Sequence, residues 1–405
     1  NLGLPLSIDA VEALAPALRY TSTFPQIPHA LLGHTDKGGK KVAGAISSDP
    51  ILIQIRFEGS SKWPNDISAM GAAKCAMLTQ IAEGVEAMKE KNDPSSAPFD
   101  GPMNVSPTHI DFGYSGYVWR IIIRADQEMH ILNGLRNPSP EAITLRQALK
   151  KNHLTRSQHH FTIHGVTSKH PAAGYTVRLI NRWIAAHMLS GQVPVEAVEL
   201  LVASVFTDPS PLQTPTTVTC AFLRCLQLLA NHDWVKSPLI VDPEAHIQSE
   251  DRANILSHFE DIRGAKFQKG PIMYIISPND CHDDGLWRPS FTQHLPEKVV
   301  LGRLSALAKK SHQFLIDCLI SKGSATSHVW SSIFQESAGS LKSYSALFRV
   351  DPENIIDIAC SSTSSNLVDV VKDDVIQTPY YRTMEKFTLG PKMLRKKVYK
   401  NLNAA

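Results

Sequence analysis

The sequence reads Arg178-Leu-Ile-Asn-Arg-Trp-Ile-Ala-Ala-His187, then Val195-Glu-Ala-Val-Glu-Leu-Leu-Val-Ala203, then Phe222-Leu-Arg-Cys-Leu-Gln-Leu-Leu229. In each of these segments apolar residues recur three or four positions apart, which is the spacing of one face of an α-helix. Val195, Val198, Val202 and Val205 show this spacing. Because each apolar stripe must be buried against a neighbour, residues 174–243 predict helices packed on helices.

The bulk composition is that of a globular protein. Of the 405 residues 43% are hydrophobic and 20% are charged, a balance that argues against long disorder and predicts about two to four domains. The chain has 41 Lys and Arg against 38 Asp and Glu, a net charge of +3. That charge is too small for a protein that coats phosphate over its whole surface, so we expect any nucleic-acid contact to be local.

The cysteines and the hydropathy exclude other classes of protein. The six cysteines are dispersed without a C-x-x-C pair, so neither a zinc ribbon nor a disulfide framework is expected, and we interpret them as reduced and intracellular. No apolar run reaches the roughly 18 residues of a membrane span. We therefore expect a soluble protein with no membrane contact. The start at Asn1 resembles the middle of a fold, which suggests a fragment.

The residues before the helical block predict a mixed unit of strands and a helix. Ile51-Leu-Ile-Gln-Ile-Arg-Phe57 is rich in β-branched and aromatic residues, as strands are. The expected elements are strands at 4–14 and 50–58, a helix from Asn65 or Asp66 to about Lys89, a loop from Glu90 to Pro107, and a β-hairpin of 109–112 with 117–123. Together they predict an α/β domain over residues 1–135.

A second domain is expected over residues 136–268, starting with a helix at Ser139-Pro140-Glu141. Serine is a favoured cap, and proline and an acid suit the first helical turn. Further helices are expected near 155–168, 174–189, 194–206, 217–231 and 247–262. A third, α/β tail domain is expected over residues 269–405, incomplete at its C-terminal end, with strands at 271–277 and 344–350 around a helix at 295–320.

Several segments resemble the nucleolar RNA-associated protein (Nrap) family. Besides the helical block, the resemblance rests on Leu18-Arg-Tyr-Thr-Ser-Thr-Phe-Pro25, Phe57-Glu-Gly-Ser-Ser-Lys-Trp-Pro-Asn-Asp66, His109-Ile-Asp111, Gly116-Tyr-Val-Trp-Arg120 and Arg395-Lys-Lys-Val-Tyr-Lys-Asn-Leu402. It implies the C-terminal portion of a longer protein, the second of two nucleotidyltransferase-like copies. The implied fold is α+β and multi-domain, with a nucleotidyltransferase-like α/β head, a helical PAP/OAS1-like body and a ferredoxin-like α/β tail.

The resemblance also implies a function in ribosome assembly. It suggests a non-catalytic scaffold of the small-subunit processome, the 90S pre-ribosome, in pre-18S ribosomal RNA processing in the nucleolus, with no cofactor. The implied partners are other processome proteins, including a partner in the UTP-C subcomplex, and pre-ribosomal RNA or U3 snoRNA. The contact with the UTP-C partner is not assigned to particular residues.

The residues themselves argue against nucleotidyl transfer. That chemistry needs carboxylates at alternate strand positions and a third acid nearby, which together hold two divalent cations. Gly59-Ser60 could begin the usual motif, but only Asp66 follows it before the helix. Asp126-Gln-Glu128 alternates, yet we interpret it as a solvated strand end, and Asp111 alone cannot hold two metals. The head is therefore expected to be an inactive relative of these enzymes.

Other candidate sites have simpler explanations. Gly38-Gly-Lys-Lys41 lacks the Ser or Thr of a phosphate-binding loop and is expected to be a surface loop. His159, His160, His164 and His170 are expected on a partly exposed helix face, although His160 and His164 have a spacing found in zinc ligands. Trp63 and Trp183 are expected to be core residues rather than platforms for stacked bases.

Two basic groups are candidates for contact with RNA phosphates. One is Lys392, Arg395, Lys396, Lys397 and Lys400, which alternate with apolar residues. The other is Lys150, Lys151 and Arg156. A solvated surface explains the first group about as well as RNA contact. Two alternative functions remain: a template-independent RNA nucleotidyltransferase whose missing acids lie upstream of Asn1, and an RNA-binding module acting alone.

Overall fold

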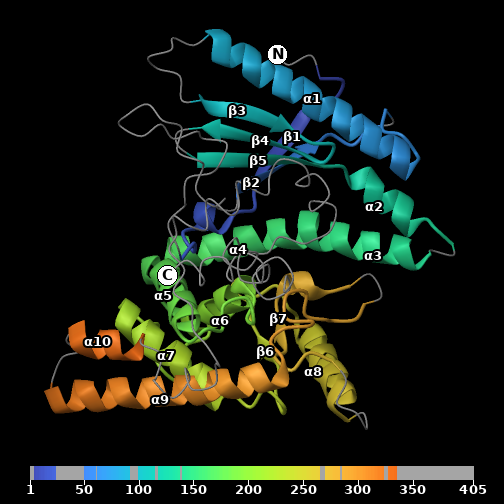
Figure 1. Cartoon of the computed structure of the whole chain (residues 1–405). Coiled ribbons are helices and arrows are strands. Elements are labelled where there is room, and N and C mark those ends of the chain that lie inside the picture. The colour runs from blue at the N-terminus through green and yellow to red at the C-terminus, as the bar shows by residue number, and fades with distance from the viewer. Residues whose placement is uncertain are drawn as a thin grey trace, which may run out of the picture.

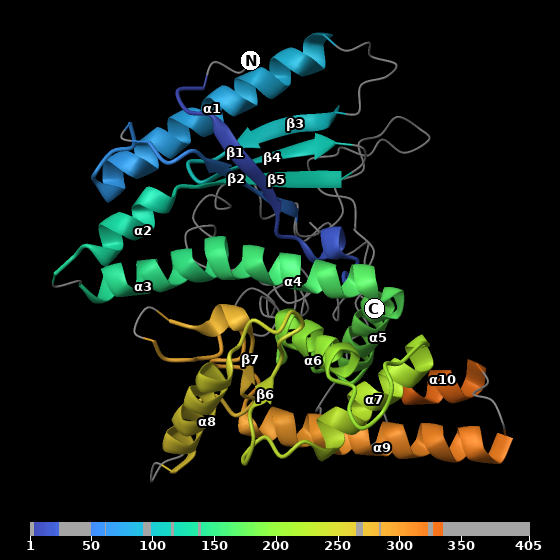
Figure 2. The ribbon, with the colours of Figure 1, turned by 180° about the vertical axis from the view of Figure 1, so that it is seen from behind.

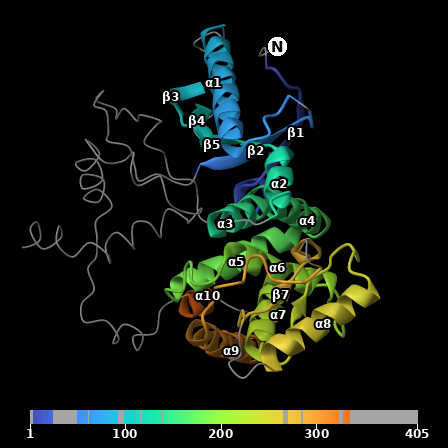
Figure 3. The ribbon, with the colours of Figure 1, turned by 90° about the vertical axis from the view of Figure 1, so that its right-hand side faces the viewer.

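The computed structural model describes residues 4–23, 50–60, 62–91, 99–114, 117–136, 139–264, 270–282, 285–322 and 327–334. A sheet lies between a long helix on one face and a second helical run on the other, and a helical unit lies beyond that run (Figure 1). We call the described part of residues 4–136 the head and that of residues 139–334 the body. Figure 2 shows the same layers from behind, and Figure 3 shows the head above the body from the side.

The head contains a five-stranded mixed sheet. Its strands are β1 (Ile8–Ala13), β2 (Ile51–Phe57), β3 (Phe99–Val105), β4 (His109–Tyr114) and β5 (Tyr117–Arg124), in the order β1-β2-β5-β4-β3. β2 and β5 are parallel, and the other neighbouring pairs are antiparallel. The strands expected at 4–14 and 50–58 and the hairpin of β4 with β5 are confirmed. The expected loop from Glu90 to Pro107 is wrong, because it contains β3.

Helix α1 (Ile67–Lys91) covers the apolar face of the sheet. The Asp66 side chain caps it by accepting a hydrogen bond from the Ala69 amide at 2.9 Å, as the sequence predicted. The core between helix and sheet contains Met70, Met77, Leu78 and Ile81 from α1 and Ile55, Phe57, Ile110, Ile121 and Ile123 from the strands. Since strand side chains alternate between faces, this core leaves the residues next to Ile55 and Ile123 on the opposite face, toward the body.

The body begins with a helical run that crosses beneath the sheet. It consists of α3 (Pro140–Leu149), the π-helical segment η3 (Lys150–Thr155) and α4 (Arg156–Lys169). The Ser139 side chain accepts a hydrogen bond from the Ala142 amide, so the expected cap is confirmed. The remaining elements are α5 (Pro171–Ala186), α6 (Val195–Thr207), α7 (Val218–Asn231), β6 (Leu239–Ile240), α8 (Ser249–Gly264), β7 (Ile275–Ile276), η4 (Pro278–Asp280), α9 (Lys298–Lys322) and α10 (Ser327–Ile333).

Helix α6 lies at the centre of the body and is buried from Ala197 to Phe206. The core around it joins α4, α5 and α7 with residues from the segment expected to form the tail, among them Met273, Leu304 and Val329. β7 of that segment pairs with β6 in a two-stranded parallel sheet. Residues 271–334 therefore pack into the body, while the expected strand at 344–350 lies outside the described residues.

No helix in the described part of the chain combines the length and apolar character that crossing a bilayer requires. Trp63 and Trp183 are 5% and 0% exposed, so their predicted places in the core are confirmed. The indole N–H of Trp183 donates to the Ser311 hydroxyl at 3.1 Å, which joins α5 to α9.

Candidate functional site between the head and the body

The sheet face that looks toward the body carries charged and polar side chains. Gln54 and Arg56 alternate with the core residue Ile55 along β2, and Arg124 lies opposite Arg56 on β5. Glu12 on β1 lies opposite Gln54. Gln54 is 0% exposed and Glu12 is 6% exposed, although both are polar. Buried polar groups need partners, and here the partners come from both the head and the body.

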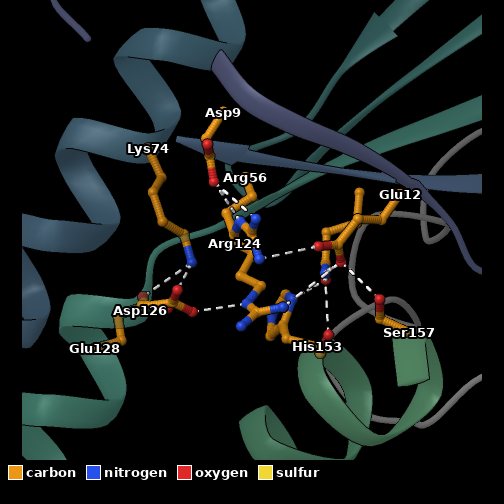
Figure 4. Close-up of polar contacts among 10 residues, drawn as sticks. Asp9, Glu12, Arg56, Lys74, Arg124, Asp126, Glu128, His153 and Ser157 are labelled. Atoms are coloured by element: carbon orange, nitrogen blue, oxygen red, sulfur yellow. Dashed lines mark hydrogen bonds and ion pairs between the residues drawn. The ribbon is translucent and has the colours of Figure 1, made fainter. Parts of the chain in front are cut away.

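Glu12 accepts hydrogen bonds from two directions. Its Oε2 accepts a hydrogen bond from the Gln54 amide nitrogen at 2.8 Å and one from the Ser157 hydroxyl of α4 at 2.7 Å. The guanidinium groups of Arg56 and Arg124 lie 3.5 Å from its two carboxylate oxygens. Figure 4 shows these side chains converging from β1, β2, β5 and α4. The carboxylate of Glu12 thus pairs with two cationic side chains and accepts hydrogen bonds from two neutral donors.

The neighbouring acids of the cluster are also paired. Arg56 donates to Asp9 at 2.8 Å, and Arg124 donates to Asp126 at 2.7 Å. Lys74 of α1 lies 2.9 Å from both oxygens of Glu128 (Figure 4). We call these residues, together with Glu12, Gln54, His153 and Ser157, the sheet-face cluster. Each of its four carboxylates has a cationic partner within 3.5 Å.

The interpretation of Asp126-Gln-Glu128 as a solvated strand end was wrong for Glu128, which is buried, whereas the Asp126 side chain is 52% exposed two residues after β5. Both acids occupy the first turn of a further helix, α2 (Asp126–Asn133), where acids are favoured by the helix dipole. Glu128 is 7% exposed and points to Lys74 rather than to solvent. Glu128 therefore joins α2 to α1, and Asp126 joins α2 to Arg124 of β5.

Gln54 links the sheet directly to the backbone of the body. Its amide nitrogen donates to the His153 carbonyl at 3.0 Å, and its amide oxygen lies 2.6 Å from His153 Nδ1. Because the nitrogen of Gln54 faces two acceptors, its oxygen must accept, and His153 carries the hydrogen on Nδ1. Burial, together with the charges of Lys74 and Arg124, lowers the pKa of His153 to about 3, so the ring is neutral at physiological pH.

A second cluster lies around Glu199 of α6, whose side chain is 0% exposed. Arg19, from the 3₁₀ helix η1 (Pro16–Arg19) of the head, donates to its two oxygens at 2.8 and 3.0 Å. The Thr21 hydroxyl also donates to it, and His159 Nε2 lies 2.6 Å from Oε2. Burial alone would raise the pKa of Glu199, but Arg19 and His159 outweigh it and hold that pKa far below its ordinary value.

Of the four histidines expected on a partly exposed helix face, His164 and His170 are half-buried as expected, and the other two are buried. His159 and His160 are 2% and 5% exposed, so the expectation is wrong for both. His159 is buried because it bonds the Glu199 carboxylate, which sequence spacing could not show. Rings of His160 and His164 stack, with centroids 5.8 Å apart and planes 8° apart. Within the described residues no group of three or more His, Cys, Asp or Glu side chains is arranged to hold a metal ion.

Asp111 is engaged by a cation as well. The Arg120 guanidinium donates to both of its oxygens at 2.7 Å, and His109 Nε2 lies 3.7 Å away. Burial and the nearby Arg120 lower the pKa of His109. Asp111, the acid considered for metal binding, is therefore held in a bidentate ion pair with Arg120.

Gly59 and Ser60, which could begin the usual motif, follow β2 and precede α1. In the same turn the Trp63 indole donates a hydrogen bond to the Glu58 carbonyl.

The structure describes only one of the two predicted basic groups. Lys151 Nζ lies 6.0 Å from the centre of the Phe291 ring, and burial lowers its pKa. Arg156 lies 3.8 Å from Glu196, and its side chain is 13% exposed. Lys150 lies beside them in η3. Lys392, Arg395, Lys396, Lys397 and Lys400, and Gly38-Gly-Lys-Lys41, lie outside the described residues.

Both clusters escaped the sequence analysis. The usable signal was a polar residue where the surrounding pattern calls for an apolar one. Gln54 lies within an otherwise apolar strand core, and Glu199 lies on a helix that is apolar on all sides. Their partners, such as Arg19, are 40 to 180 residues away in sequence, a separation that periodicity does not reveal.

Two family models match this chain, one after the other. The model "Nrap protein nucleotidyltransferase domain 4" matches residues 1–168, and "Nrap protein PAP/OAS1-like domain 5" matches residues 170–336. The α+β fold with a nucleotidyltransferase-like head and a helical PAP/OAS1-like body is therefore confirmed. The domain boundaries and the ferredoxin-like tail stay predictions, because residues 335–405 lie outside the described part.

Curated relatives cover most of the chain. Nucleolar protein 6 of Xenopus laevis is 29% identical over 87% of this chain, and that of Homo sapiens is 28% identical over 76%. The U3 small nucleolar RNA-associated protein 22 of Schizosaccharomyces pombe is 27% identical over 76%. The chain spans 30%, 26% and 27% of the lengths of these relatives, so it corresponds to less than a third of each.

The comparison with solved structures finds polymerizing enzymes at TM-scores below 0.5. The structure titled "Crystal structure of mtPAP in complex with GTP" has a TM-score of 0.38 and 10% identity, over 81% of this chain and 64% of that chain. A structure of the Cid1 terminal uridylyl transferase has a TM-score of 0.39 and 9% identity, over 80% of this chain and 85% of that chain. The activities in these titles belong to those proteins.

Proposed function

The chain belongs to the Nrap family, and from this premise we propose that it is a non-catalytic scaffold in ribosome biogenesis. It would act in the small-subunit processome during pre-18S ribosomal RNA processing, in the nucleolus. The names of the relatives support this proposal, since they refer to nucleolar proteins and to U3 small nucleolar RNA. The partners would be other processome proteins, including one of the UTP-C subcomplex, and pre-ribosomal RNA or U3 snoRNA.

The observation that supports a non-catalytic role is the pairing of the carboxylates on the sheet face. Two-metal catalysis needs carboxylate oxygens that are free to bind divalent cations. Glu12 is bound by two guanidinium groups, and Asp111 is bound by the fork of Arg120. A metal would have to displace these cations and break the hydrogen bonds of Gln54 and Ser157.

The same contacts support a rigid scaffold. The sheet-face cluster connects the head to η3 and α4, and the Glu199 cluster connects η1 of the head to α4 and α6. Both clusters lie between the two units, so the head and the body should move as one. A surface of fixed shape can position several partners relative to one another without any chemical step.

The predicted basic residues remain part of this proposal. Lys150, Lys151 and Arg156 are candidates for contact with RNA phosphate, although Lys151 also contacts the Phe291 ring and Arg156 also pairs with Glu196. The basic residues between Lys392 and Lys400 are proposed to contact RNA through charge alone, because no base-reading arrangement is evident in their sequence.

The proposal is tested by replacing the endogenous protein in cells with variants of the full protein that carries this chain. Glu12→Gln and Asp111→Asn keep the shape of each side chain but remove the charge that a metal would need. We expect both variants to support pre-18S RNA processing and to co-sediment with U3-containing particles as the wild type does.

Thermal unfolding of each purified variant controls for loss of the fold. A stable Glu12→Gln variant that enters particles but stops pre-18S processing would contradict a purely structural role and favour catalysis. A wild-type protein found outside U3-containing particles would contradict the processome assignment.

A further inference from the structure

A row of aromatic rings lies where η1 of the head meets α4 and α5 of the body, elements that lie side by side in Figure 1. Tyr20 stacks on His164 with centroids 6.3 Å apart and planes 27° apart, and His164 stacks on His160. Phe161 packs edge-on against His160 at 5.7 Å. Tyr20 and Phe161, at the two ends of the row, are 66% and 57% exposed. We call these four residues the ring row.

The backbone fixes Tyr20 in an uncommon conformation. Its φ angle is 63°, in the left-handed region that residues other than glycine rarely adopt. Helix α5 approaches this turn closely, because a Cβ atom at Gly174 would lie 3.0 Å from the Tyr20 carbonyl oxygen. Since two thirds of Tyr20 is exposed, burial of the ring does not explain why the turn is held in place.

The two histidines in the middle of the row have ring nitrogens that form no hydrogen bond with the described residues. The Nδ1 atoms of His160 and His164 are buried, and neither has a hydrogen-bond partner among the described residues. Burial and the charge of Arg19 lower the pKa of His160 to about 4, so its ring is neutral at physiological pH. Neutral flat rings stack on other flat rings without the desolvation penalty of a charge.

Cations are present on the two helices that carry or contact the ring row. Arg178 of α5 lies 4.4 Å from the centre of the Tyr175 ring, and Lys169 is exposed at the end of α4. The nearby acids are paired: Glu199 is bound by Arg19 and His159, and the Glu244 carboxylate, whose oxygen would lie 3.7 Å from a Cβ at Gly165, lies 3.5 Å from His246. Exposed rings beside such cations match the chemistry of a strand with flat bases and a phosphate backbone.

We propose that the ring row binds single-stranded RNA, with bases stacking on Tyr20 and Phe161 and phosphates contacting Arg178 and Lys169. This inference rests on the proposed function, in which the protein contacts RNA, and it names the surface and the form of RNA. Duplex RNA would bind weakly, because its bases already stack on one another and leave no free face. Base stacking tolerates any sequence, so we expect little base preference.

Fluorescence anisotropy with the whole chain tests the proposal, using a short labelled pyrimidine-rich RNA strand and a hairpin duplex as probes. Tyr20→Asn removes the ring and keeps a residue that tolerates positive φ. Tyr20→Asn and Phe161→Ala should each weaken binding of the single strand by at least about fivefold, the lower end for one stacked base. The salt dependence should not change in these variants, whereas Arg178→Gln should reduce its slope by about one.

Tyr117→Ala is the matched control, because Tyr117 is 46% exposed on β5 and lies outside the ring row. It should bind as the wild type does, and thermal unfolding should show that all variants are folded. If the wild type binds the single strand and both ring variants bind it equally well, the ring row is not the site, although the proposed function stands. The inference is also overturned if the duplex binds as tightly, or if the ring variants lose a protein partner while their RNA affinity is unchanged. Absence of RNA binding by the wild type would overturn it together with the RNA contact in the proposed function.

Discussion

Glu199 is a carboxylate without access to solvent, and its partners come from two separate segments of the chain. Arg19, Thr21 and His159 together supply its hydrogen bonds. Because its low pKa shows that the ionised form is favoured, the carboxylate can only accept, and His159 must carry its hydrogen on Nε2. An ion pair with side chains 3% and 0% exposed is costly to bury, so loss of one partner should matter more than loss of both.

The first prediction concerns this pair. Glu199→Leu should reduce the free energy of unfolding by about 3–5 kcal/mol, because it leaves the Arg19 charge buried and unpaired. The double variant with Arg19→Met should be less destabilised than Glu199→Leu alone. Urea denaturation measures both. Asp233→Ala is the control, since its pair with Lys236 is exposed and should contribute little to stability. A Glu199→Leu variant no less stable than the control would refute this view of the cluster.

The second prediction concerns His153 and pH. Its pKa is about 3 in the folded protein and 6.5 as an ordinary histidine, so the unfolded chain binds the proton more tightly. The contribution of His153 to the free energy of unfolding should therefore be fully present above about pH 6.5 and should be lost as the pH drops toward 3. The slope from this one group approaches about 1.4 kcal/mol per pH unit.

Urea denaturation at several pH values checks this prediction by comparing the wild type with His153→Gln, which keeps an amide donor for Gln54. The variant should lose less stability than the wild type between about pH 6.5 and pH 4, whatever its stability at neutral pH. Other groups with lowered pKa values, among them His109, His160, His232, His312 and Glu199, are common to both proteins and cancel in the comparison. Equal slopes would show that His153 is not held neutral by the fold.

At the scale of elements, sequence periodicity predicted most helices and strands but missed β3 and α2. β3 contains Gly101 and Pro102, which are depleted in strands, yet an edge strand tolerates them. The pairing register also shifts between Asp100 and Asn104. The eight residues of α2 are too few to show a helical period. The π-helical segment η3 joins α3 to α4, and no side-chain pattern distinguishes it from the helices on either side.

The third prediction compares two helical glycines. Gly302→Ala in α9 should raise the free energy of unfolding by about 0.5–1 kcal/mol, because its added Cβ meets no atom within 4 Å. Gly174→Ala in α5 should gain less, because its Cβ would lie 3.0 Å from the Tyr20 carbonyl oxygen. Thermal or urea unfolding of both variants measures the difference. Equal gains would show that the contact between η1 and α5 is looser than the structure indicates.

At the scale of the whole molecule, the sheet and the helical body are joined through buried polar residues rather than through a continuous apolar core. The main apolar clusters of the head and of the body are separate, and Glu12, Gln54 and Glu199 lie between the two units. From hydrophobic spacing the sequence predicted a mixed head followed by a helical body, with a separate tail from residue 269. It could not predict the contacts between them, because Gln54 meets His153 and Arg19 meets Glu199 only after both units have folded.

The central claim is that the carboxylates facing the body serve the fold and do not hold catalytic metal ions. Incorporation of labelled nucleotides into an RNA primer, with Mg²⁺ or Mn²⁺ and the full protein that carries this chain, tests it most directly. We expect no incorporation above background by the wild type, and none by Glu12→Gln or Asp111→Asn. Metal-dependent incorporation by the wild type that either variant abolishes would contradict the claim.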